Sequence, residues 1–335
     1  MGMQVVVLAG GIGSRLKPWT ETVPKPLLPL LDKTLLEQVV SIVPEDDIDE
    51  VVIAAGYMIE EMRQYFSTIE LPYDVVILPE DEPMGTGGAL KNCIDHVSGR
   101  FACFNGDVVS SLDFSAMSTQ HDGMNALGTL ALWEVEDPTR FGIVGIDDNN
   151  KVTRFKEKPE PEEVFSNLIN AGSYILEDDI FDLMPDGKFS IEREVFPALA
   201  ERGELGGFPF EGFFIDAGTP SSWLSAVEVA IQNERFSSGS SSEGTWFADG
   251  KTADCILGEF NMFSSGIEVS RDSVISQTTL LEGSKVGSGA RLERCMIGKN
   301  AQVGAGCHLK DVLVDHGAIV PEGSILAGGT FPQIE

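Results

Sequence analysis

The chain is poor in basic residues. Of its 335 residues only 23 are Lys or Arg, against 53 Asp or Glu, and the formal net charge is −30. Nucleic acids and anionic membrane surfaces are bound through basic patches, so this balance argues against both as partners. A dense acidic surface is typical of a protein that stays soluble in a salt-rich cytoplasm, and we therefore expect a halophilic, cytoplasmic protein.

Cysteine is scarce, and long apolar runs are missing. The five cysteines are odd in number and show no C-x-x-C spacing, so neither a disulfide framework nor a zinc site is expected, and reduced intracellular thiols are the simpler interpretation. The first apolar run, 5–9, is too short for a signal peptide and has no basic flank before it. Because no stretch is long enough to span a membrane, we expect no membrane partner.

Short β-branched runs alternate with amphipathic helical patterns over the first 230 or so residues. Helices are predicted at 34–43, where Thr34 and Glu37 form a capping-box pattern, and at 58–66. This alternation predicts an α/β fold, with a Rossmann-like, mostly parallel sheet sandwiched by helices. The expected strands are 5–8, 51–54, 75–78, 101–104, 126–133, 142–145, 152–155 and 173–176.

The composition changes after the predicted α/β part. A Ser- and Gly-rich stretch at 237–244 predicts a flexible linker or exposed loop. Beyond it, aliphatic residues recur every six positions, with one slip of phase; they are Val274, Leu280, Val286, Leu292, Ile297, Val303 and Leu309. A six-residue period is the mark of a parallel β-helix with the aliphatic residues pointing inward, and accidental spacing in a β-sandwich is the alternative. We therefore predict a catalytic domain at 1–235, a linker at 236–252 and a β-helix at 253–335.

A glycine-rich motif follows the first predicted strand directly. Residues 8–18 read Leu-Ala-Gly-Gly-Ile-Gly-Ser-Arg-Leu-Lys-Pro. Glycines let backbone N–H groups approach phosphate oxygens closely, and Arg15 can clamp two phosphates with its rigid donor fork. A dinucleotide-binding G-x-G-x-x-G is the rival interpretation, but no third glycine stands at position 16, and a Walker loop would need Gly-Lys-Ser/Thr.

A lysine between two prolines lies a short way beyond this motif. Pro24 and Pro26 should hold the flanking backbone extended and fix the direction of Lys25, although a surface lysine in a rigid loop would look the same. The stretch 10–33 is locally basic, which indicates an anionic ligand in so acidic a chain. Its charged residues are Arg15, Lys17, Lys25 and Lys33 against Glu21 and Asp32.

The pattern Gly-Gly-x-Gly-x-Arg-Leu-x-Pro-Trp-Thr, followed by Pro-Lys-Pro-Leu-Leu-Pro, resembles the sugar-1-phosphate nucleotidylyltransferases. That family includes mannose-1-phosphate guanylyltransferases and glucose-1-phosphate uridylyl-, thymidylyl- and adenylyltransferases. Several members carry hexapeptide repeats, so the resemblance covers essentially the whole chain and implies a left-handed β-helix. The implied reaction is in-line attack by a sugar-1-phosphate oxygen on the α-phosphorus of a nucleoside triphosphate, with pyrophosphate leaving. Such catalysis works by positioning and charge neutralisation, without a nucleophile from the protein.

The resemblance also implies roles for individual residues. Arg15 and Lys25 would stabilise charge on the pyrophosphate and α-phosphate, and Lys158 would hold the sugar phosphate. Glu157 and Asn170 would bind sugar hydroxyls, beside the glycine strand that contains Gly142. Two remote carboxylates, Asp107 and Asp216, would bind Mg²⁺, a cation that prefers oxygen ligands. The implied nucleotide-binding residues are Leu8, Gly10, Gly11, Gly13, Glu80, Gly85 and Thr86. The stretch 151–158 around Lys158 is again locally basic, with Lys151, Arg154 and Lys156.

Glu80 stands where uridylyl- and thymidylyltransferases typically carry Gln. Guanine presents adjacent N1–H and N2–H₂ donors, which a carboxylate accepts together, whereas uracil and thymine suit an amide. The resemblance therefore favours GTP and mannose-1-phosphate. UTP or dTTP with glucose-1-phosphate is the alternative, and Glu80 as one of several solvated acids on an exposed loop is another.

Three other functions compete with this one. A non-catalytic regulatory subunit of the same fold would be expected to lack Arg15, Lys25, Asp107 or Asp216, and all four are present. A glycosyltransferase would usually carry Asp-x-Asp, which 105–109 lacks. A bifunctional uridylyltransferase–acetyltransferase would need a longer β-helix.

Two further expectations concern the C-terminal part, and a third concerns departures from the family pattern. Exposed β-helix ends commonly pair with another copy, so we expect a homo-oligomer assembled through 253–335. Every catalytic candidate precedes residue 235, so truncation there should lower stability more than it alters the chemistry. Trp19 stands where Leu is usual in the family, and Thr34 stands where Pro often precedes the helix; neither departure is expected to affect the reaction.

Overall fold

The computed structural model describes residues 2–80, 82–249 and 255–333. The chain forms two compact units. The first unit comprises Met1–Ile12 and Val39–Phe214, and the second comprises Gly13–Gln38 and Ile215–Glu335. These units are defined by spatial contacts and combine segments that are distant along the chain. They therefore do not test the predicted domain boundaries at 235 and 253, which stay predictions.

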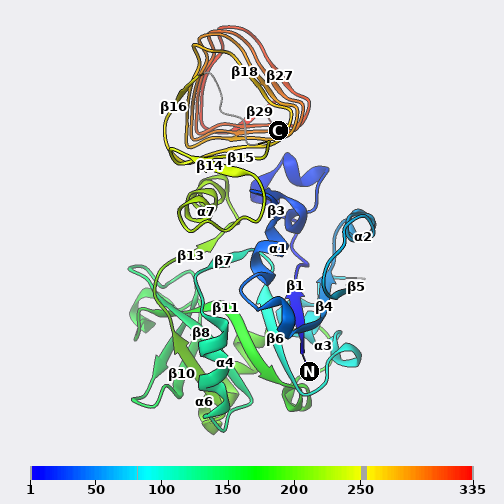
Figure 1. The fold of residues 1–335 in the computed structure, drawn as a ribbon. Coiled ribbons are helices and arrows are strands. Elements are labelled where there is room, and N and C mark those ends of the chain that lie inside the picture. Colours follow the sequence, from blue (N-terminus) through cyan, green and yellow to red (C-terminus); the bar gives the residue numbers. More distant parts are fainter. Residues whose placement is uncertain (1, 81, 250–254, 334–335) are drawn as a thin grey trace. The chain divides into compact units, whose positions relative to one another are not determined.

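The first unit is built on a nine-stranded mixed sheet. Its strand order is β10-β9-β11-β6-β1-β4-β5, with β8 beside β11 and β12 beside β8 (Figure 1). Strands β1, β4, β5 and β6 are mutually parallel, as predicted, whereas β8, β9, β10 and β11 form an antiparallel part. The bounds are β1 Met3–Leu8, β4 Ile48–Ala55, β5 Asp74–Pro79, β6 Arg100–Asn105, β8 Gly128–Glu134, β9 Gly142–Ile146, β10 Val152–Glu157, β11 Leu168–Glu177 and β12 Leu205–Pro209. All eight predicted strands are present, and the shorter β7 is Val108–Ser110.

The parallel strands end at one edge of the sheet. Leu8, the last residue of β1, pairs with Ala54 of β4 and with Asn105 of β6. Ala55 in turn pairs with Pro79, the last residue of β5. In open α/β sheets ligands bind beyond the carboxyl ends of the strands, so this edge is where a site is expected.

Helices cover both faces of this sheet. On one face Val6 and Cys103 belong to a buried cluster with Leu90 and Phe196. On the opposite face Phe104 packs edge-on against Phe114, with ring centroids 5.9 Å apart. The helices are α2 Ile59–Phe66, α3 Gly85–Lys91, α4 Phe114–Asp122, α5 Ile191–Glu194 and α6 Phe196–Arg202. Among the described residues no helix is both long enough and apolar enough to cross a membrane.

The predicted capping box, Thr34 with Glu37, is confirmed. The Thr34 backbone N–H donates to Glu37 Oε2 at 2.7 Å, and the Glu37 N–H donates to Thr34 Oγ1 at 3.2 Å. The helix, α1, spans Leu35–Val40 and is shorter than the predicted 34–43. It is preceded by the short strands β2 Pro29–Leu30 and β3 Lys33–Thr34.

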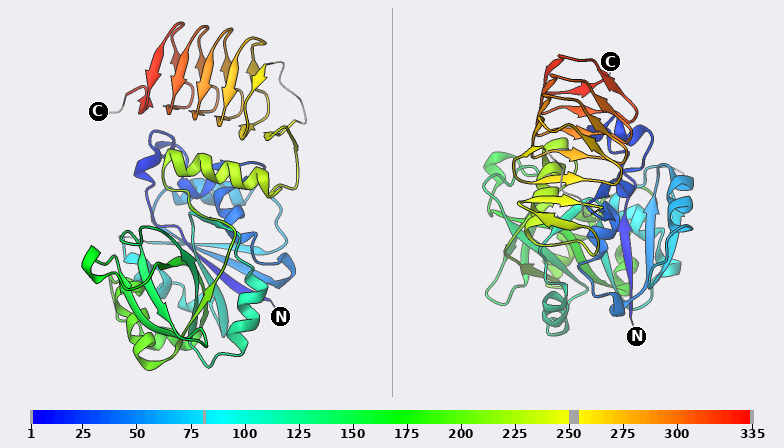
Figure 2. Two further views of the ribbon diagram at one scale, coloured as in Figure 1. Left: turned by 90° about the vertical axis from the view of Figure 1, so that its left-hand side faces the viewer. Right: turned by 45° about the horizontal axis from the view of Figure 1, so that its top comes forward.

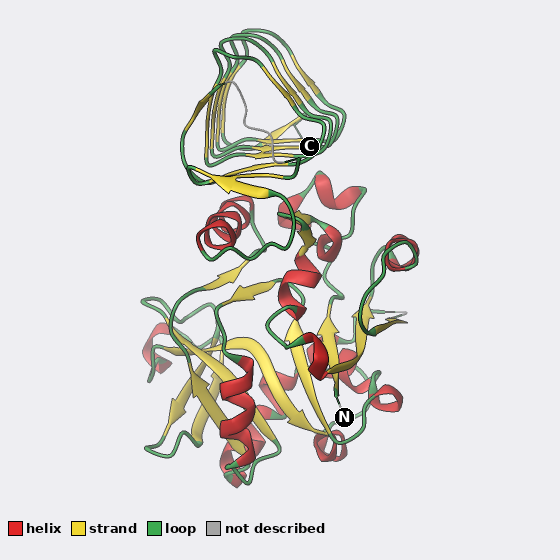
Figure 3. Cartoon of the chain, viewed as in Figure 1, coloured by secondary structure: helices red, strands yellow, loops and turns green. Residues whose placement is uncertain are grey.

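The C-terminal part of the second unit is a left-handed parallel β-helix. Its coils have a triangular outline in Figure 1 and stack side by side in Figure 2. In Figure 3 the coils consist of strands joined by loops. The strands are β14 Ser240–Ser242, β15 Thr245–Phe247, β16 Ile256–Leu257, β17 Asn261–Phe263, β18 Glu268–Val269, β19 Val274–Ser276, β20 Thr279–Leu280, β21 Lys285–Val286, β22 Arg291–Glu293, β23 Met296–Ile297, β24 Gln302–Val303, β25 His308–Lys310, β26 Leu313–Val314, β27 Ile319–Val320, β28 Ile325–Ala327 and β29 Thr330–Phe331. Helix α7, Pro220–Gln232, and strand β13, Phe214–Asp216, precede them.

The repeat is not a strict hexapeptide, and one predicted anchor is wrong. Ile275 is fully buried and lies in register with Leu292, whereas Val274 is only partly buried. Ile275 and Leu280 are five positions apart, whereas Leu280 and Val286 are six positions apart. Counting back six positions from Leu280 therefore reaches Val274, one residue before the inward-pointing Ile275. The slip of phase seen in the sequence arises because one side of each triangular coil is one residue shorter than the other two.

The predicted linker is partly ordered as strand. Within 236–252, β14 pairs antiparallel with β15, and β15 pairs parallel with β17 of the coils. Trp246 and Phe247, which follow the Ser-rich residues, are buried. Their apolar contacts explain why this part of the predicted linker is ordered. Residues 250–252 lie outside the described part of the chain.

Candidate active site

The glycine motif makes a tight turn at Gly13. Its φ of 68° is a left-handed conformation that favours glycine. A Cβ at this position would lie 3.0 Å from Thr20 Cγ2 and 3.1 Å from Lys25 Cβ. The Thr20 hydroxyl also donates to the Gly13 carbonyl at 2.9 Å. Gly13, Thr20 and Lys25 are therefore packed together within residues 13–28, which we call the phosphate segment.

Arg15 lies beside Asp216, about two hundred residues further along the chain. A Cβ at Gly218 would be 2.6 Å from Arg15 Nη2 and 2.8 Å from Asp216 Oδ1. The guanidinium and the carboxylate thus face the same glycine, and Arg15 is exposed while Asp216 is half-buried. The second unit therefore brings two of the predicted site residues together.

Lys25 is only 8% exposed and lies beside the Gly13 turn. The backbone of Pro24 is extended, with ψ 138°, as predicted. Lys25–Leu27 instead form a short 3-10 turn, because the Leu27 N–H donates to the Pro24 carbonyl at 2.8 Å. The expectation of extended backbone on both sides of Lys25 is therefore wrong on its C-terminal side. The nearby charge of Lys17 is paired with Glu21 at 3.0 Å.

In the first unit Glu80 lies against the glycine motif. It follows β5, and a Cβ at Gly10 would be 3.2 Å from Glu80 Oε2. Glu80 Oε1 is buried and has no hydrogen-bond partner among the described residues. Burial raises the pKa of this carboxyl, while a backbone hydrogen bond from Met84 opposes the shift. The carboxylate at this edge therefore retains an acceptor oxygen for donors of a ligand.

Asp107 lies at the same sheet edge. It lies two positions after the last residue of β6, and the intervening Gly106 donates its N–H to the carbonyl of Leu8 at 3.0 Å. Asp107 is half-buried and belongs to the first unit, whereas Asp216 belongs to the second. The shared role of the two carboxylates in binding a metal stays a prediction.

The glycines at 85 and 87 have a packing role that the sequence did not indicate. A Cβ at Gly85 would lie 2.4 Å from the Phe189 carbonyl oxygen, and one at Gly87 would lie 2.1 Å from Cε2 of the Phe189 ring. Thr86 donates its hydroxyl to Glu192 Oε2 at 2.5 Å and accepts the Ile191 N–H at 3.2 Å. These residues join α3 to the 189–192 stretch, and their predicted contact with the nucleotide remains untested.

Glu157 ends β10, in the antiparallel part of the sheet, and Lys158 follows it. Glu157 Oε2 would lie 2.8 Å from a Cβ at Gly142, and Glu157 Oε1 is 3.6 Å from Lys158 Nζ. Burial, followed by the charge of Glu192, raises the pKa of Glu157, and Lys158 opposes the shift. Lys158 has a φ of 46°, a conformation that costs a non-glycine residue roughly 1 kcal/mol. Strained backbone of this kind clusters at functional sites.

Asn170, on β11, has local partners. Its Oδ1 accepts the Gly172 N–H at 3.1 Å, and its Nδ2 donates to Tyr174 Oη at 2.9 Å. Tyr174 is fully buried, and burial raises the pKa of its hydroxyl. These contacts orient the Asn170 amide, and its bond to a sugar hydroxyl stays a prediction.

Glu192 is a buried acid that sequence reasoning missed. It is 8% exposed and accepts hydroxyl hydrogen bonds from Thr86 at 2.5 Å and from Ser190 at 2.6 Å. Its charge contributes to the raised pKa values of Glu157 and Tyr174, which places it near the predicted sugar side. In the sequence it looks like any acid in the first turn of a helix, so no local signal separates it from solvated neighbours.

Each basic residue in the stretch around Lys158 has a local partner, although only Lys156 and Lys158 itself face a carboxylate. Lys151 Nζ donates to the Gly203 carbonyl at 3.1 Å, and Lys156 pairs with Glu163 at 3.0 Å. The Arg154 guanidinium stacks 4.2 Å from the ring centroid of Phe165. The predicted local reversal of charge is thus weaker than the residue count indicated. No disulfide forms among the described residues, which include all five cysteines.

Comparisons with known proteins identify the family. Residues 4–233 match the nucleotidyl transferase family, and residues 245–328 match the GlmU-like C-terminal hexapeptide family. The mannose-1-phosphate guanylyltransferase catalytic subunit beta of Danio rerio is 30% identical over 93% of this chain and 90% of that protein. The mannose-1-phosphate guanyltransferase of Neurospora crassa is 29% identical over 99% of this chain and 100% of that protein.

Two solved structures are similar to the catalytic part. A putative glucose-1-phosphate thymidylyltransferase from Bacillus anthracis has a TM-score of 0.60, with 28% identity, and the match covers 67% of this chain and 94% of that one. HddC from Yersinia pseudotuberculosis has a TM-score of 0.56, also with 28% identity, covering 67% of this chain and 97% of that one. This chain therefore belongs to the nucleotidyl transferase family, as a sugar-1-phosphate nucleotidylyltransferase with a C-terminal left-handed β-helix of hexapeptide repeats.

Proposed function

We propose that this enzyme joins GTP to mannose-1-phosphate, forming GDP-mannose and pyrophosphate. The observation that carries this proposal is Glu80, whose carboxylate lies against Gly10 and has a buried oxygen without a partner among the described residues. A buried acceptor that lacks a donor costs about 1–3 kcal/mol, so a ligand with matching donors would recover that free energy on binding.

Guanine supplies the matching donors. Its N1–H and N2–H₂ groups are adjacent, so one carboxylate accepts both, whereas the carbonyl oxygens of uracil and thymine would be repelled by it. The relatives from Danio rerio and Neurospora crassa are named as guanylyltransferases, which supports guanine as the base. The Bacillus anthracis neighbour is named for thymidylyl transfer, so UTP or dTTP with glucose-1-phosphate stays the alternative.

The charged residues would act by positioning and by neutralising charge. Arg15 would donate to the departing pyrophosphate, and Lys25 would approach the α-phosphate from beside Gly13. Lys158 would hold the attacking sugar phosphate, while Glu157 would accept a sugar hydroxyl. Groups fixed before the reaction stabilise developing charge without the cost of reorganising solvent.

The carboxylates Asp107 and Asp216 fit a Mg²⁺ ion by their chemistry. Both are half-buried aspartates, which offer the hard oxygen ligands that Mg²⁺ prefers, and this ion is usually bound by one or two carboxylates together with substrate phosphates. When bound, the ion would neutralise charge on the reacting phosphates. We also propose that the enzyme acts in the cytoplasm and is a homo-oligomer.

The test is a competition between nucleotides. GTP, UTP, dTTP and ATP are offered together with mannose-1-phosphate or glucose-1-phosphate, and the nucleotide sugars formed are quantified. Wild type should prefer GTP and mannose-1-phosphate, and Glu80→Gln should shift the ratio toward UTP or dTTP by roughly tenfold or more, the scale of one charge-assisted hydrogen bond. Glu82→Gln is the matched control, because Glu82 is an exposed acid two residues away. A wild type that prefers UTP or dTTP, or a Glu80→Gln variant with unchanged preference, would show that Glu80 does not read the base.

A further inference from the structure

Trp19 connects the phosphate segment to the β-helix. Its side chain is fully buried, and its indole N–H donates to the carbonyl oxygen of Val314, in β26, at 2.9 Å. Its ring stacks on His316, with centroids 5.3 Å apart and planes 19° apart. Residue 19 is thus held by a hydrogen bond and a ring contact to one coil, about three hundred residues further along the chain.

The contacts of Trp19 continue to the predicted catalytic groups. Trp19 begins a 3-10 turn whose next residue, Thr20, is fully buried. The Thr20 hydroxyl donates to the Gly13 carbonyl, and its methyl group lies at the Gly13 turn. Arg15 follows that turn, and Lys25 packs against it. Displacing Trp19 would therefore move the turn that Arg15 follows and against which Lys25 packs.

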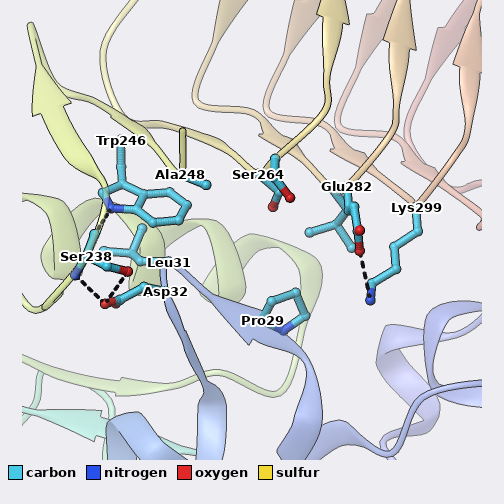
Figure 4. Close-up of a pocket in the computed structure, with 11 residues that line it drawn as sticks. Pro29, Leu31, Asp32, Ser238, Trp246, Ala248, Ser264, Glu282 and Lys299 are labelled. Carbon is cyan, nitrogen blue, oxygen red and sulfur yellow. Dashed lines mark hydrogen bonds and ion pairs between the residues drawn. The ribbon is translucent and has the colours of Figure 1, made fainter. Parts of the chain in front are cut away.

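Beyond the phosphate segment, residues 31 and 32 are also fastened to the C-terminal part of the second unit. The carboxylate oxygen Oδ2 of Asp32 accepts the backbone N–H groups of Ser237 and Ser238, each at 2.7 Å. The Leu31 N–H donates to Met262 Sδ at 3.4 Å, within the coils. A pocket of about 260 Å³ lies beside this attachment, with Trp246 and Lys299 among its lining residues (Figure 4).

We infer that the β-helix takes part in catalysis by positioning the phosphate segment, and that Trp19 and His316 are positioning residues for Arg15 and Lys25. This inference rests on the proposed phosphate contacts of those two cations. A loop alone would sample many conformations, whereas stacked coils with regular backbone hydrogen bonding supply a rigid support. Displacements of about 1 Å at a reacting group can cost on the order of a hundredfold in rate. Truncation after residue 235 should then alter the chemistry as well as the stability, contrary to the expectation from the sequence.

The experiment compares three variants with one control in the full chain. Trp19→Leu removes both the hydrogen bond and the ring contact, Trp19→Phe keeps a ring but loses the N–H donor, and His316→Phe keeps a ring opposite Trp19. Leu292→Ala is the control, because Leu292 is buried inside the coils on a different sheet from Val314 and should destabilise the β-helix without touching the phosphate segment. Melting temperature, kcat and KM, and hydrogen–deuterium exchange of residues 13–28 are measured for each protein.

We expect kcat to fall at least tenfold in Trp19→Leu, and less in Trp19→Phe and His316→Phe, at temperatures where every variant is folded. Exchange in 13–28 should rise in the same order, while Leu292→Ala loses more thermal stability but keeps kcat within about twofold. If Trp19→Leu retains kcat and exchange, or if Leu292→Ala lowers kcat equally at equal stability, the β-helix acts only as a stabilising element. Should Trp19→Leu fail to fold, the two phenylalanine variants decide by the same criteria. The exchange readout does not depend on turnover, so an error in the proposed nucleotide or sugar is distinguished from an error in this inference.

Discussion

The charged residues at the phosphate segment differ in what surrounds them. Arg15 is exposed and faces Gly218 together with Asp216, whereas Lys17, two residues further on, is paired with Glu21 on the surface. The two cations are close in sequence and similar in charge, yet only Lys17 is in a surface ion pair with a neighbouring acid, and Arg15 is the one predicted to bind phosphate. A surface pair of this kind contributes about 0–1 kcal/mol to stability.

Substitutions at these residues should separate catalysis from folding. We expect Arg15→Ala to lower kcat by roughly 10²–10³-fold, because it removes a preorganised donor to developing charge. Asp107→Asn and Asp216→Asn should lower turnover by orders of magnitude with the fold intact, because a divalent ion loses a charged ligand.

Steady-state kinetics at saturating Mg²⁺, with circular dichroism as the folding control, would check these expectations. Lys17→Ala is the matched variant for Arg15→Ala and should keep nearly normal turnover. Near-normal turnover in Asp107→Asn at saturating Mg²⁺ would overturn the metal assignment, and equal losses in Lys17→Ala and Arg15→Ala would mean that general loop charge matters rather than Arg15.

At the scale of elements, a buried histidine ties one helix to the central sheet. His121 of α4 is 1% exposed, and its Nδ1 lies 2.7 Å from Thr129 Oγ1 of β8. Its Nε2 lies 3.0 Å from Glu177 Oε1 of β11. Burial lowers the pKa of His121 below its ordinary value of 6.5, although the hydrogen bond with Glu177 opposes the shift. The folded state therefore binds the proton of this histidine less readily than the unfolded chain does.

This difference predicts a loss of stability on mild acidification. Above the unfolded-state pKa of about 6.5, His121 is neutral in both states, and its contribution to the free energy of unfolding is fully present. As the pH falls from there toward the lower pKa of the folded state, the unfolded chain takes up the proton first, and this favours unfolding. The melting temperature of wild type should thus fall between pH 7 and pH 5, and His121→Gln should reduce that slope. His316, whose pKa is also lowered by burial, leaves part of the slope in the variant. Parallel curves for wild type and His121→Gln would contradict the assignment.

For the whole molecule the charge balance dominates. With 53 acidic and 23 basic residues the folded chain carries a large excess of one sign, and self-repulsion opposes the compact state. Added salt shortens the Debye length to about 3 Å at 1 M, which screens this repulsion.

We therefore predict that the melting temperature rises markedly from dilute buffer into molar KCl or NaCl. A gain of roughly 2 kcal/mol would correspond to about 3 °C for cooperative unfolding of a chain of this length, and larger gains in proportion. Differential scanning calorimetry across a salt series would check this, and the two salts should act alike if screening is the cause. A flat or falling curve would mean that the acidic surface is not an adaptation to salt.

Exposed apolar side chains on the β-helix point to assembly. Ile319 and Ile325 are 64% and 79% exposed, and Ile256 is 62% exposed. We predict a homo-oligomer that forms partly through 253–335, and Ile319→Lys with Ile325→Lys should weaken it. Light scattering at micromolar concentration is the measurement, with Ile94→Lys in the first unit as the control. A monomeric wild type would refute the prediction.

Local signals in the sequence determined much of this protein. The β-branched runs are the strands of the sheet, Thr34 and Glu37 form the capping box, and the six-residue spacing of aliphatic residues indicates the β-helix. These features depend on neighbours within about one turn or one repeat, so the chain alone specifies them. The family motif likewise names its residues without any coordinates.

Only the tertiary structure decided which distant residues meet. It placed the phosphate segment with the C-terminal unit, set Arg15 beside Asp216, and stacked Trp19 on His316. It also buried Glu192 among hydroxyl groups and put Phe189 against the glycines at 85 and 87, neither of which has a local signature. The physical reason is that such contacts join residues separated by a hundred or more positions. Their geometry follows from how whole elements pack, and no local period or propensity encodes that.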